Sequence, residues 1–199
     1  KALLKRFQQT RILVIGDLIL DEYVWGTVER ISPEAPIPVV WVERESVMPG
    51  GAANVANNVK ALGGKVDLLG VVGEDAGGRG LQEELENRGI STEGVLSDPK
   101  RPTTGKTRVI AHHQQIVRID RERLDKISGA VLEQLLELAA KKIPGVEGVI
   151  VEDYGKGLVH PGLLKPVIRL AKRHGKVITV DPKEEHIVSY QGVTALTPN

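Results

Sequence analysis

The chain alternates short aliphatic runs with longer stretches in which apolar residues recur every three or four positions. Aliphatic runs are typical of buried strands, and the longer period predicts amphipathic helices. We expect strands at 12–15, 66–72, 149–151, 177–180 and 194–197, and helices at 52–62, 80–88, 127–142 and 161–174. This alternation predicts an α/β fold with a mostly parallel sheet covered by helices on both faces.

Two segments interrupt this rhythm, at about 22–48 and 103–120. The first contains three prolines and a short β-like run at 39–42, and the second reads as two extended runs joined near His112 and His113. We interpret them as a small β lid beside the main sheet rather than as a separate domain.

Composition narrows the class of protein. The 199 residues are 41% hydrophobic but only 3% aromatic, carry a net charge of +1, and contain no cysteine. Disulfide scaffolds, thiolate zinc sites and cysteine nucleophiles are excluded. We expect no nucleic-acid partner, because there is no basic surplus, and no membrane partner, because no apolar run approaches about 20 residues. A cytoplasmic location is the expectation.

Polar residues follow most of the expected strands. In open parallel sheets, ligands bind beyond the carboxyl ends of the strands, so these residues outline one candidate site. Taken singly, each could instead be a helix cap or a turn former. The residues are Asp17, Glu74, Asp75, Glu152, Asp153, Asp181 and Asn199.

The most distinctive stretch runs from Gly50 to Asn58. Gly50 and Gly51 allow a ligand to approach the backbone, and the helix that they open presents N–H groups to polar or anionic partners. Asn54 and Asn58 lie one turn apart and share a face. Asparagine is a poor helix former, so a binding role is favoured over a solvent-facing polar stripe.

Two acids near the first strand fit sugar recognition. A carboxylate can accept hydrogen bonds from two neighbouring hydroxyl groups, and such charge-assisted bonds are strong. Asp17 and Asp21 have the chemistry for this role. Alternatively, and with equal weight, one of them could cap a helix and the other could be an ordinary surface acid.

Cations of the lid form a second candidate group. Lys106 and Arg108 share a face of one extended run, and Arg118 lies on the next. Cations that converge in this way suit a phosphate-bearing substrate. Alternatively, these charges could lie on an exposed edge strand and protect it against aggregation. Lys156, in a glycine-flanked loop after a strand, is a weaker candidate. The histidines have no metal-ligand spacing, and the metal site is unknown.

These residues resemble the ribokinase-like (PfkB) carbohydrate kinases. The run 50–56, followed by Gly63 and Gly73, matches the family's first signature, and Asp17 with Asp21 resembles its sugar-contacting segment. The end of the chain at Asn199 resembles the start of the Asn-x-x-Glu motif that helps to place Mg²⁺ and the ATP phosphates. The resemblance implies a three-layer α/β/α ribokinase-like fold with a small β lid.

A narrower resemblance is to the family's D-glycero-D-manno-heptose-7-phosphate kinases. Segments 30–39, 49–56, 114–120, 153–157 and 181–183 carry it. It implies ATP- and Mg²⁺-dependent phosphorylation of the anomeric O1, giving heptose 1,7-bisphosphate for ADP-heptose and lipopolysaccharide core synthesis, and a homodimer formed through the lid. With the cations chosen for their charge, the candidate substrate-binding residues are Asp17, Asp21, Gly50, Gly51, Asn54, Lys106, Arg108, Arg118, Asp153 and Lys156. The candidate cofactor-binding residue is Asn199.

The sequence departs from the family pattern in three places. His112-His113 stands where Arg-Asn is expected, and Glu152 stands where serine is expected. The family's Gly-Ala-Gly-Asp loop, whose aspartate is the catalytic base, does not occur. We therefore expect 1–199 to be the N-terminal portion of one kinase domain, with the base and the ATP-binding portion beyond residue 199, and to be inactive alone. The alternatives are another sugar or nucleoside kinase of the family and a non-catalytic sugar-phosphate-binding protein.

Overall fold

The computed structural model describes residues 6–198, which form two sheets and four main helices. The larger sheet has six parallel strands in the order β10-β9-β8-β1-β4-β5. Its strands are β1 (Arg11–Gly16), β4 (Lys65–Gly73), β5 (Val95–Asp98), β8 (Gly148–Glu152), β9 (Val177–Asp181) and β10 (Ala195–Leu196). The prediction of a mostly parallel sheet is confirmed.

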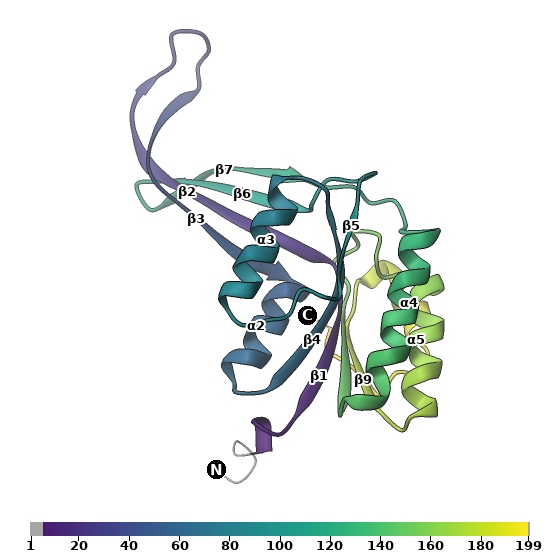
Figure 1. Ribbon diagram of the computed structural model, residues 1–199. Helices are drawn as coiled ribbons and strands as arrows, with labels where there is room; N and C mark the ends of the chain where they lie inside the picture. Colours follow the sequence, from purple (N-terminus) through teal and green to yellow (C-terminus); the bar gives the residue numbers. More distant parts are fainter. Residues whose placement is uncertain (1–5, 199) are drawn as a thin grey trace.

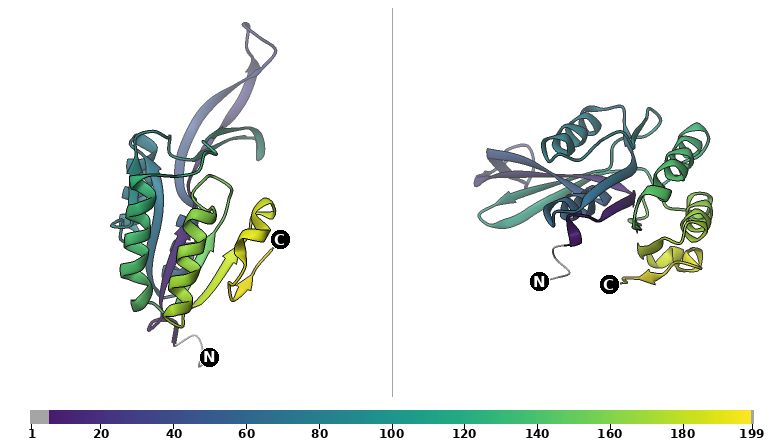
Figure 2. Two further views of the ribbon diagram at one scale, coloured as in Figure 1. Left: turned by 90° about the vertical axis from the view of Figure 1, so that its right-hand side faces the viewer. Right: turned by 60° about the horizontal axis from the view of Figure 1, so that its bottom comes forward.

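Helices cover both faces of this sheet (Figures 1 and 2). On one face α2 (Ala52–Ala61) and α3 (Ala76–Asn87) pack against alternate residues of the central strands, such as Val14 and Leu68. On the other face α4 (Ala130–Lys142) and α5 (Pro161–Arg173) pack against Leu13 and Leu69. The three-layer α/β/α arrangement follows from strands that are apolar on both faces.

The lid is a separate four-stranded sheet in the order β3-β2-β6-β7. Its first two strands, β2 (Leu18–Ile31) and β3 (Pro38–Gly51), form a long antiparallel hairpin whose tip projects away from the body (Figure 1). The other two, β6 (Gly105–Ala111) and β7 (Gln114–Arg121), form a second hairpin that pairs through β6 with β2. The predicted lid is confirmed, but its strands are longer than the pattern indicated.

Several element bounds differ from expectation. The expected run at 39–42 covers only the first part of β3, and β5 was not predicted. Helix α3 begins four residues earlier than expected because Asp75 caps it, accepting a hydrogen bond from the Gly78 N–H at 2.8 Å. Helix α4 begins at Ala130 rather than at residue 127. Two short 3₁₀ helices, Ile143–Gly145 and Glu184–Tyr190, complete the described residues.

The two sheets meet where β1 ends and β2 begins. Gly16 is the last residue of β1, and the lid strand β2 starts only two residues later. Strand β3 then returns from the lid and leads directly into α2. The carboxyl ends of the central strands, the start of α2 and the base of the lid are therefore adjacent, as expected for a ligand site in an open α/β sheet.

No helix of the described residues is both long enough and apolar enough to cross a membrane.

Candidate functional site

Asp17 lies at the junction of the two sheets and is 4% exposed. Its carboxylate accepts hydrogen bonds from three backbone N–H groups of the loop after β8, at Tyr154 (2.9 Å), Lys156 (3.1 Å) and Leu158 (3.2 Å). Burial raises the pKa of the Asp17 carboxyl more than these bonds lower it. Asp17 thus holds this loop against the end of β1, a role that the sequence did not reveal.

Asp153 begins the same loop, and its side chain is fully buried. One carboxylate oxygen accepts the Gly155 N–H at 2.8 Å, and the other contacts His186 Nδ1 and accepts the Tyr190 hydroxyl, both at 2.7 Å. Burial and the bond to Asp153 raise the pKa of Tyr190 above its usual value. The carboxylate of Asp153 therefore stabilises the loop from within, and both of its oxygens have partners there.

Asp21 is on β2, beside the glycines that precede α2. Arg108 Nη1 on β6 donates to its Oδ1 at 2.6 Å, and a Cβ added to Gly50 would lie 2.4 Å from its Oδ2. The sequence placed Arg108 with the phosphate-binding cations. In the structure Arg108 forms an ion pair with Asp21, whose other carboxylate oxygen lies beside the Gly50 backbone.

The remaining predicted cations form one chain of ion pairs across the lid base. Arg118 Nε donates to Asp120 at 2.8 Å, and Lys106 Nζ contacts Asp120 at 2.9 Å and Glu122 at 3.7 Å. Lys156 reaches the same Glu122 carboxylate at 2.8 Å. Arg118 and Lys106 lower the pKa of Asp120 to about 2. Three cations from two hairpin strands and one loop thus converge on two carboxylates.

This chain of ion pairs joins the lid to the body. Lys156 belongs to the loop that Asp17 holds, whereas Glu122 follows β7 of the lid. Counting Arg108 and Asp21, four cations face three carboxylates, so the group retains a positive charge. The sequence predicted the cations but not Glu122, whose position just beyond a strand gave no sign of its partners.

The start of α2 lies beside this group. Gly51 is the N-cap, with φ of 56°, and no side chain caps the helix. Its first backbone N–H groups are therefore available to a ligand, apart from that of Ala52, which donates to the Asp17 carbonyl at 3.0 Å. Asn54 and Asn58 are exposed on one face, whereas Asn57 accepts a hydrogen bond from Arg88. The predicted shared face of Asn54 and Asn58 is confirmed.

The other strand-end residues divide into caps and site residues. Asp75 caps helix α3, which is the alternative role given above for the strand-end residues. Glu152 and Asp181 are register partners at the ends of β8 and β9. Asn199 lies outside the described residues. Within residues 6–198 no group of three or more acidic or histidine side chains is arranged to hold a metal ion, so we place no metal contact on them.

Comparison with known proteins identifies the family. The model of the pfkB family carbohydrate kinases matches residues 9–199. The chain belongs to this family of carbohydrate kinases. It is 50% identical over 189 residues to the bifunctional protein HldE of Helicobacter pylori strain J99 and 46% identical over 199 residues to HldE of Trichlorobacter lovleyi. These alignments cover 95% and 100% of this chain, but only 41% and 40% of the relatives' own length.

Solved structures confirm the ribokinase-like fold. Phosphofructokinase-2 from Escherichia coli superposes with a TM-score of 0.70 at 20% identity, over 96% of this chain and 61% of its own. Ribokinase of Arabidopsis thaliana, complexed with ribose and ATP, superposes with a TM-score of 0.67 at 18% identity, over 96% of this chain and 60% of its own. The chain thus spans about three-fifths of these kinases.

Proposed function

We propose that this chain forms the sugar-binding part of a kinase that transfers the γ-phosphoryl group of ATP to the anomeric O1 of D-glycero-D-manno-heptose 7-phosphate. The observation that carries the proposal is the convergence of Lys106, Arg118 and Lys156 beside the uncapped start of α2. A neutral sugar needs no cationic clamp, but a sugar phosphate does. The similarity to HldE proteins supports the same assignment.

In this proposal the sugar lies between the lid and the ends of the central strands. Asp21, Asn54 and the backbone at Gly50 and Gly51 bind its hydroxyl groups, while Asp17 positions the adjoining loop. Bringing the substrate phosphate into the ion-pair chain replaces carboxylate partners of the cations with phosphate oxygens and draws the lid toward the body. Such positioning and exclusion of water supply much of the catalysis in phosphoryl transfer.

ATP is the phosphoryl donor that membership of the family implies. We propose that Mg²⁺ enters with its phosphates, since metal ions neutralise the charge that develops during transfer. The described residues supply neither the proton acceptor for O1 nor a set of metal ligands, and no step is assigned to them there. Asn199, outside the described residues, remains the predicted contributor to nucleotide binding.

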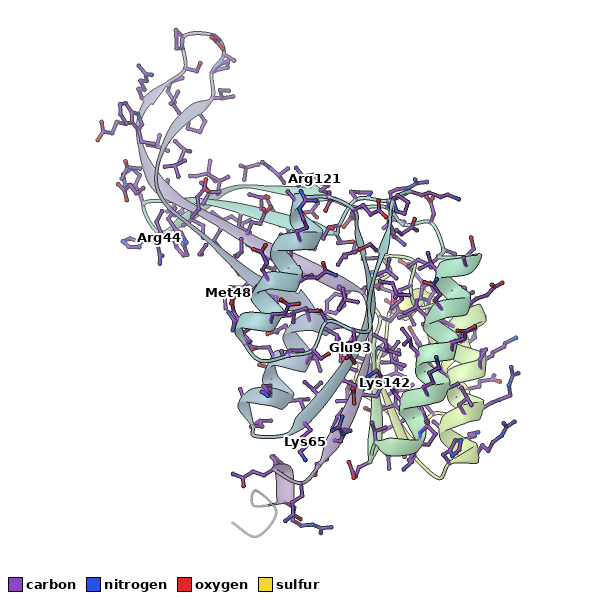
Figure 3. The ribbon with its side chains drawn as sticks, viewed as in Figure 1. Arg44, Met48, Lys65, Glu93, Arg121 and Lys142 are labelled. Carbon is purple, nitrogen blue, oxygen red and sulfur yellow. The ribbon has the colours of Figure 1, made fainter. Side chains whose placement is uncertain are left out.

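We predict that Arg118→Gln raises KM for heptose 7-phosphate about tenfold with little change in kcat. A charge-assisted hydrogen bond from Arg118 to the phosphate is equally present in the ground and transition states, so its loss weakens binding without slowing the chemical step. Arg121→Gln is the matched control, because Arg121 lies three residues after Arg118 on the same strand and the alternation turns it to the opposite face. Figure 3 shows Arg121 at the end of β7. Steady-state kinetics of the whole protein measure both variants. An unchanged KM for Arg118→Gln would show that Arg118 does not bind the phosphate.

A panel of substrates separates the alternatives. The proposal expects the highest kcat/KM with heptose 7-phosphate, lower values with fructose 6-phosphate and ribose, and none with nucleosides. A higher kcat/KM with a neutral sugar or a nucleoside would show that the proposed substrate is wrong. Tight binding of the sugar phosphate without ATP consumption by the whole protein would instead indicate a sensor.

We also propose that two copies of the chain pair through the apolar face of the lid. This face exposes Ile37, Val42 and Val117, which are 56%, 55% and 46% accessible. Unpaired apolar patches of this kind commonly mark protein interfaces. We predict that Val42→Lys halves the molecular mass measured by sedimentation velocity, whereas Leu62→Lys, an exposed leucine at the end of α2, leaves it unchanged. A wild-type monomer at micromolar concentration would contradict this pairing.

A further inference from the structure

Arg101 is a partly buried arginine in the turn between β5 and β6, and its side chain reaches two other segments. Its Nη2 donates to the backbone carbonyl of Arg123 at 2.9 Å and to that of Lys156 at 2.6 Å. Arg123 belongs to the segment that follows β7 of the lid, and Lys156 to the loop that follows β8. One guanidinium group therefore joins three segments that are far apart along the chain.

The backbone of Lys156 is held from both sides. The Asp17 carboxylate accepts its N–H at 3.1 Å, and Arg101 donates to its carbonyl oxygen at 2.6 Å. The flanking residues Gly155 and Gly157 have φ of 68° and 93°, in a region that glycine adopts far more readily than other residues. A lysine between two such glycines has little backbone restraint of its own. The contacts with Asp17 and Arg101 therefore determine where the lysine side chain begins.

Arg101 also holds the other end of the ion pair between Lys156 and Glu122. Arg123, whose carbonyl oxygen it binds, directly follows Glu122, and the Glu122 carboxylate contacts Lys156 Nζ at 2.8 Å. These two side chains are 25% and 16% exposed, so solvent screens the pair less than it screens a fully exposed pair. Arg123 Nη1 in turn donates to the Lys100 carbonyl at 2.6 Å. The turn that carries Arg101 is thus joined twice to the segment after β7.

We propose that Arg101 is a positioning residue for the phosphate group of the sugar substrate, and that it acts through Lys156. This inference rests on the proposed function. By holding the Lys156 carbonyl and the backbone beside Glu122, Arg101 keeps the lysine ammonium group where phosphate oxygens can replace the carboxylate. Arginine suits this role, because it stays charged in proteins and presents its N–H groups in a rigid plane.

A double-mutant cycle tests this role by titration calorimetry of the whole protein with heptose 7-phosphate. We expect Arg101→Gln to raise Kd about tenfold, because binding must then order a loop that the wild type holds in place. Lys156→Met should also raise Kd about tenfold, because a charged donor to the phosphate is lost. In the Lys156→Met background, Arg101→Gln should raise Kd by less than about twofold, since two residues that act through one contact are not additive.

Lys100→Gln is the matched control, because Lys100 is the exposed neighbour of Arg101 and the change removes the same charge. We expect it to alter Kd by less than about twofold. In Arg101→Gln the KM for ATP should also stay within about twofold of the wild-type value, whereas a general loss of structure would affect both substrates. If Arg101→Gln fails to fold, Arg101→Lys replaces it in the same cycle, because an ammonium group does not reproduce the planar guanidinium.

The outcomes separate this inference from the proposed function. Equal weakening by the Arg101 substitution in both backgrounds would show that Arg101 acts independently of Lys156, and would overturn the inference alone. An unchanged Kd in either single variant would do the same. No binding of heptose 7-phosphate by the wild type would overturn the proposed function as well.

Discussion

Replacing Asp17 with alanine is expected to lower the free energy of unfolding by about 3–5 kcal/mol. The substitution leaves three backbone N–H groups without their acceptor, and each such loss costs about 1–3 kcal/mol before water or loop movement recovers part of it. Asp17→Asn should cost less, about 1–3 kcal/mol, because its amide keeps one oxygen but turns an NH₂ group toward N–H donors. Urea titration of the whole protein measures both variants.

The control for Asp17→Ala is Asp125→Ala. The Asp125 side chain is 65% exposed and forms a surface ion pair with Arg123, so its loss should cost less than about 1 kcal/mol. Both Asp17 variants should also bind sugar phosphate more weakly, because the loop that carries Lys156 is no longer held. A stability of Asp17→Ala within 1 kcal/mol of the wild type would show that the loop does not depend on this carboxylate.

Gly51→Ala is expected to destabilise the protein by about 3 kcal/mol and to abolish sugar binding. Gly51 has φ of 56° and ψ of −135°, a conformation that side chains other than glycine avoid. An added Cβ would also lie 2.3 Å from the Asp17 carbonyl oxygen, which is fixed in the backbone and already accepts the Ala52 N–H. Relief of this clash must shift the start of α2, and the predicted sugar contacts shift with it.

Gly80→Ala is the matched control for Gly51→Ala. Gly80 lies within α3, and a Cβ there would meet no atom within 4 Å. Alanine at such a position should stabilise the helix by up to about 1 kcal/mol. Thermal unfolding and calorimetry with heptose 7-phosphate measure the pair. If Gly51→Ala has the melting temperature of the wild type and binds the sugar equally well, the strained turn at Gly51 does not position the sugar-binding site.

The layered fold could be predicted from the sequence. Buried strands give continuous apolar runs, whereas helices with one apolar face repeat apolar residues every three or four positions. The long lid strands could not, since β2 and β3 leave the core after a few residues and then alternate polar and apolar side chains around a proline-rich tip. Strand β5 was missed because four residues with two polar side chains carry too little pattern.

The candidate site was predictable in its residue types but not in its pairings. The glycines before α2 and the shared face of Asn54 and Asn58 follow from local rules. The partners of Asp17 and Asp153 lie up to 141 and 37 residues away, so only the folded chain shows that these carboxylates hold a loop. Glu152 was predicted among the strand-end residues and as a departure from the expected serine, but its burial at the end of β8 could not be predicted.

Phosphorus NMR of the reaction products tests the central claim most directly. The whole protein is incubated with heptose 7-phosphate, ATP and Mg²⁺, and the phosphorus spectrum is followed over time. The account predicts a new phosphomonoester signal coupled to the anomeric proton, equal in amount to the ADP formed, while the 7-phosphate signal persists. Formation of ADP without that signal, or phosphate on another hydroxyl group, would contradict it.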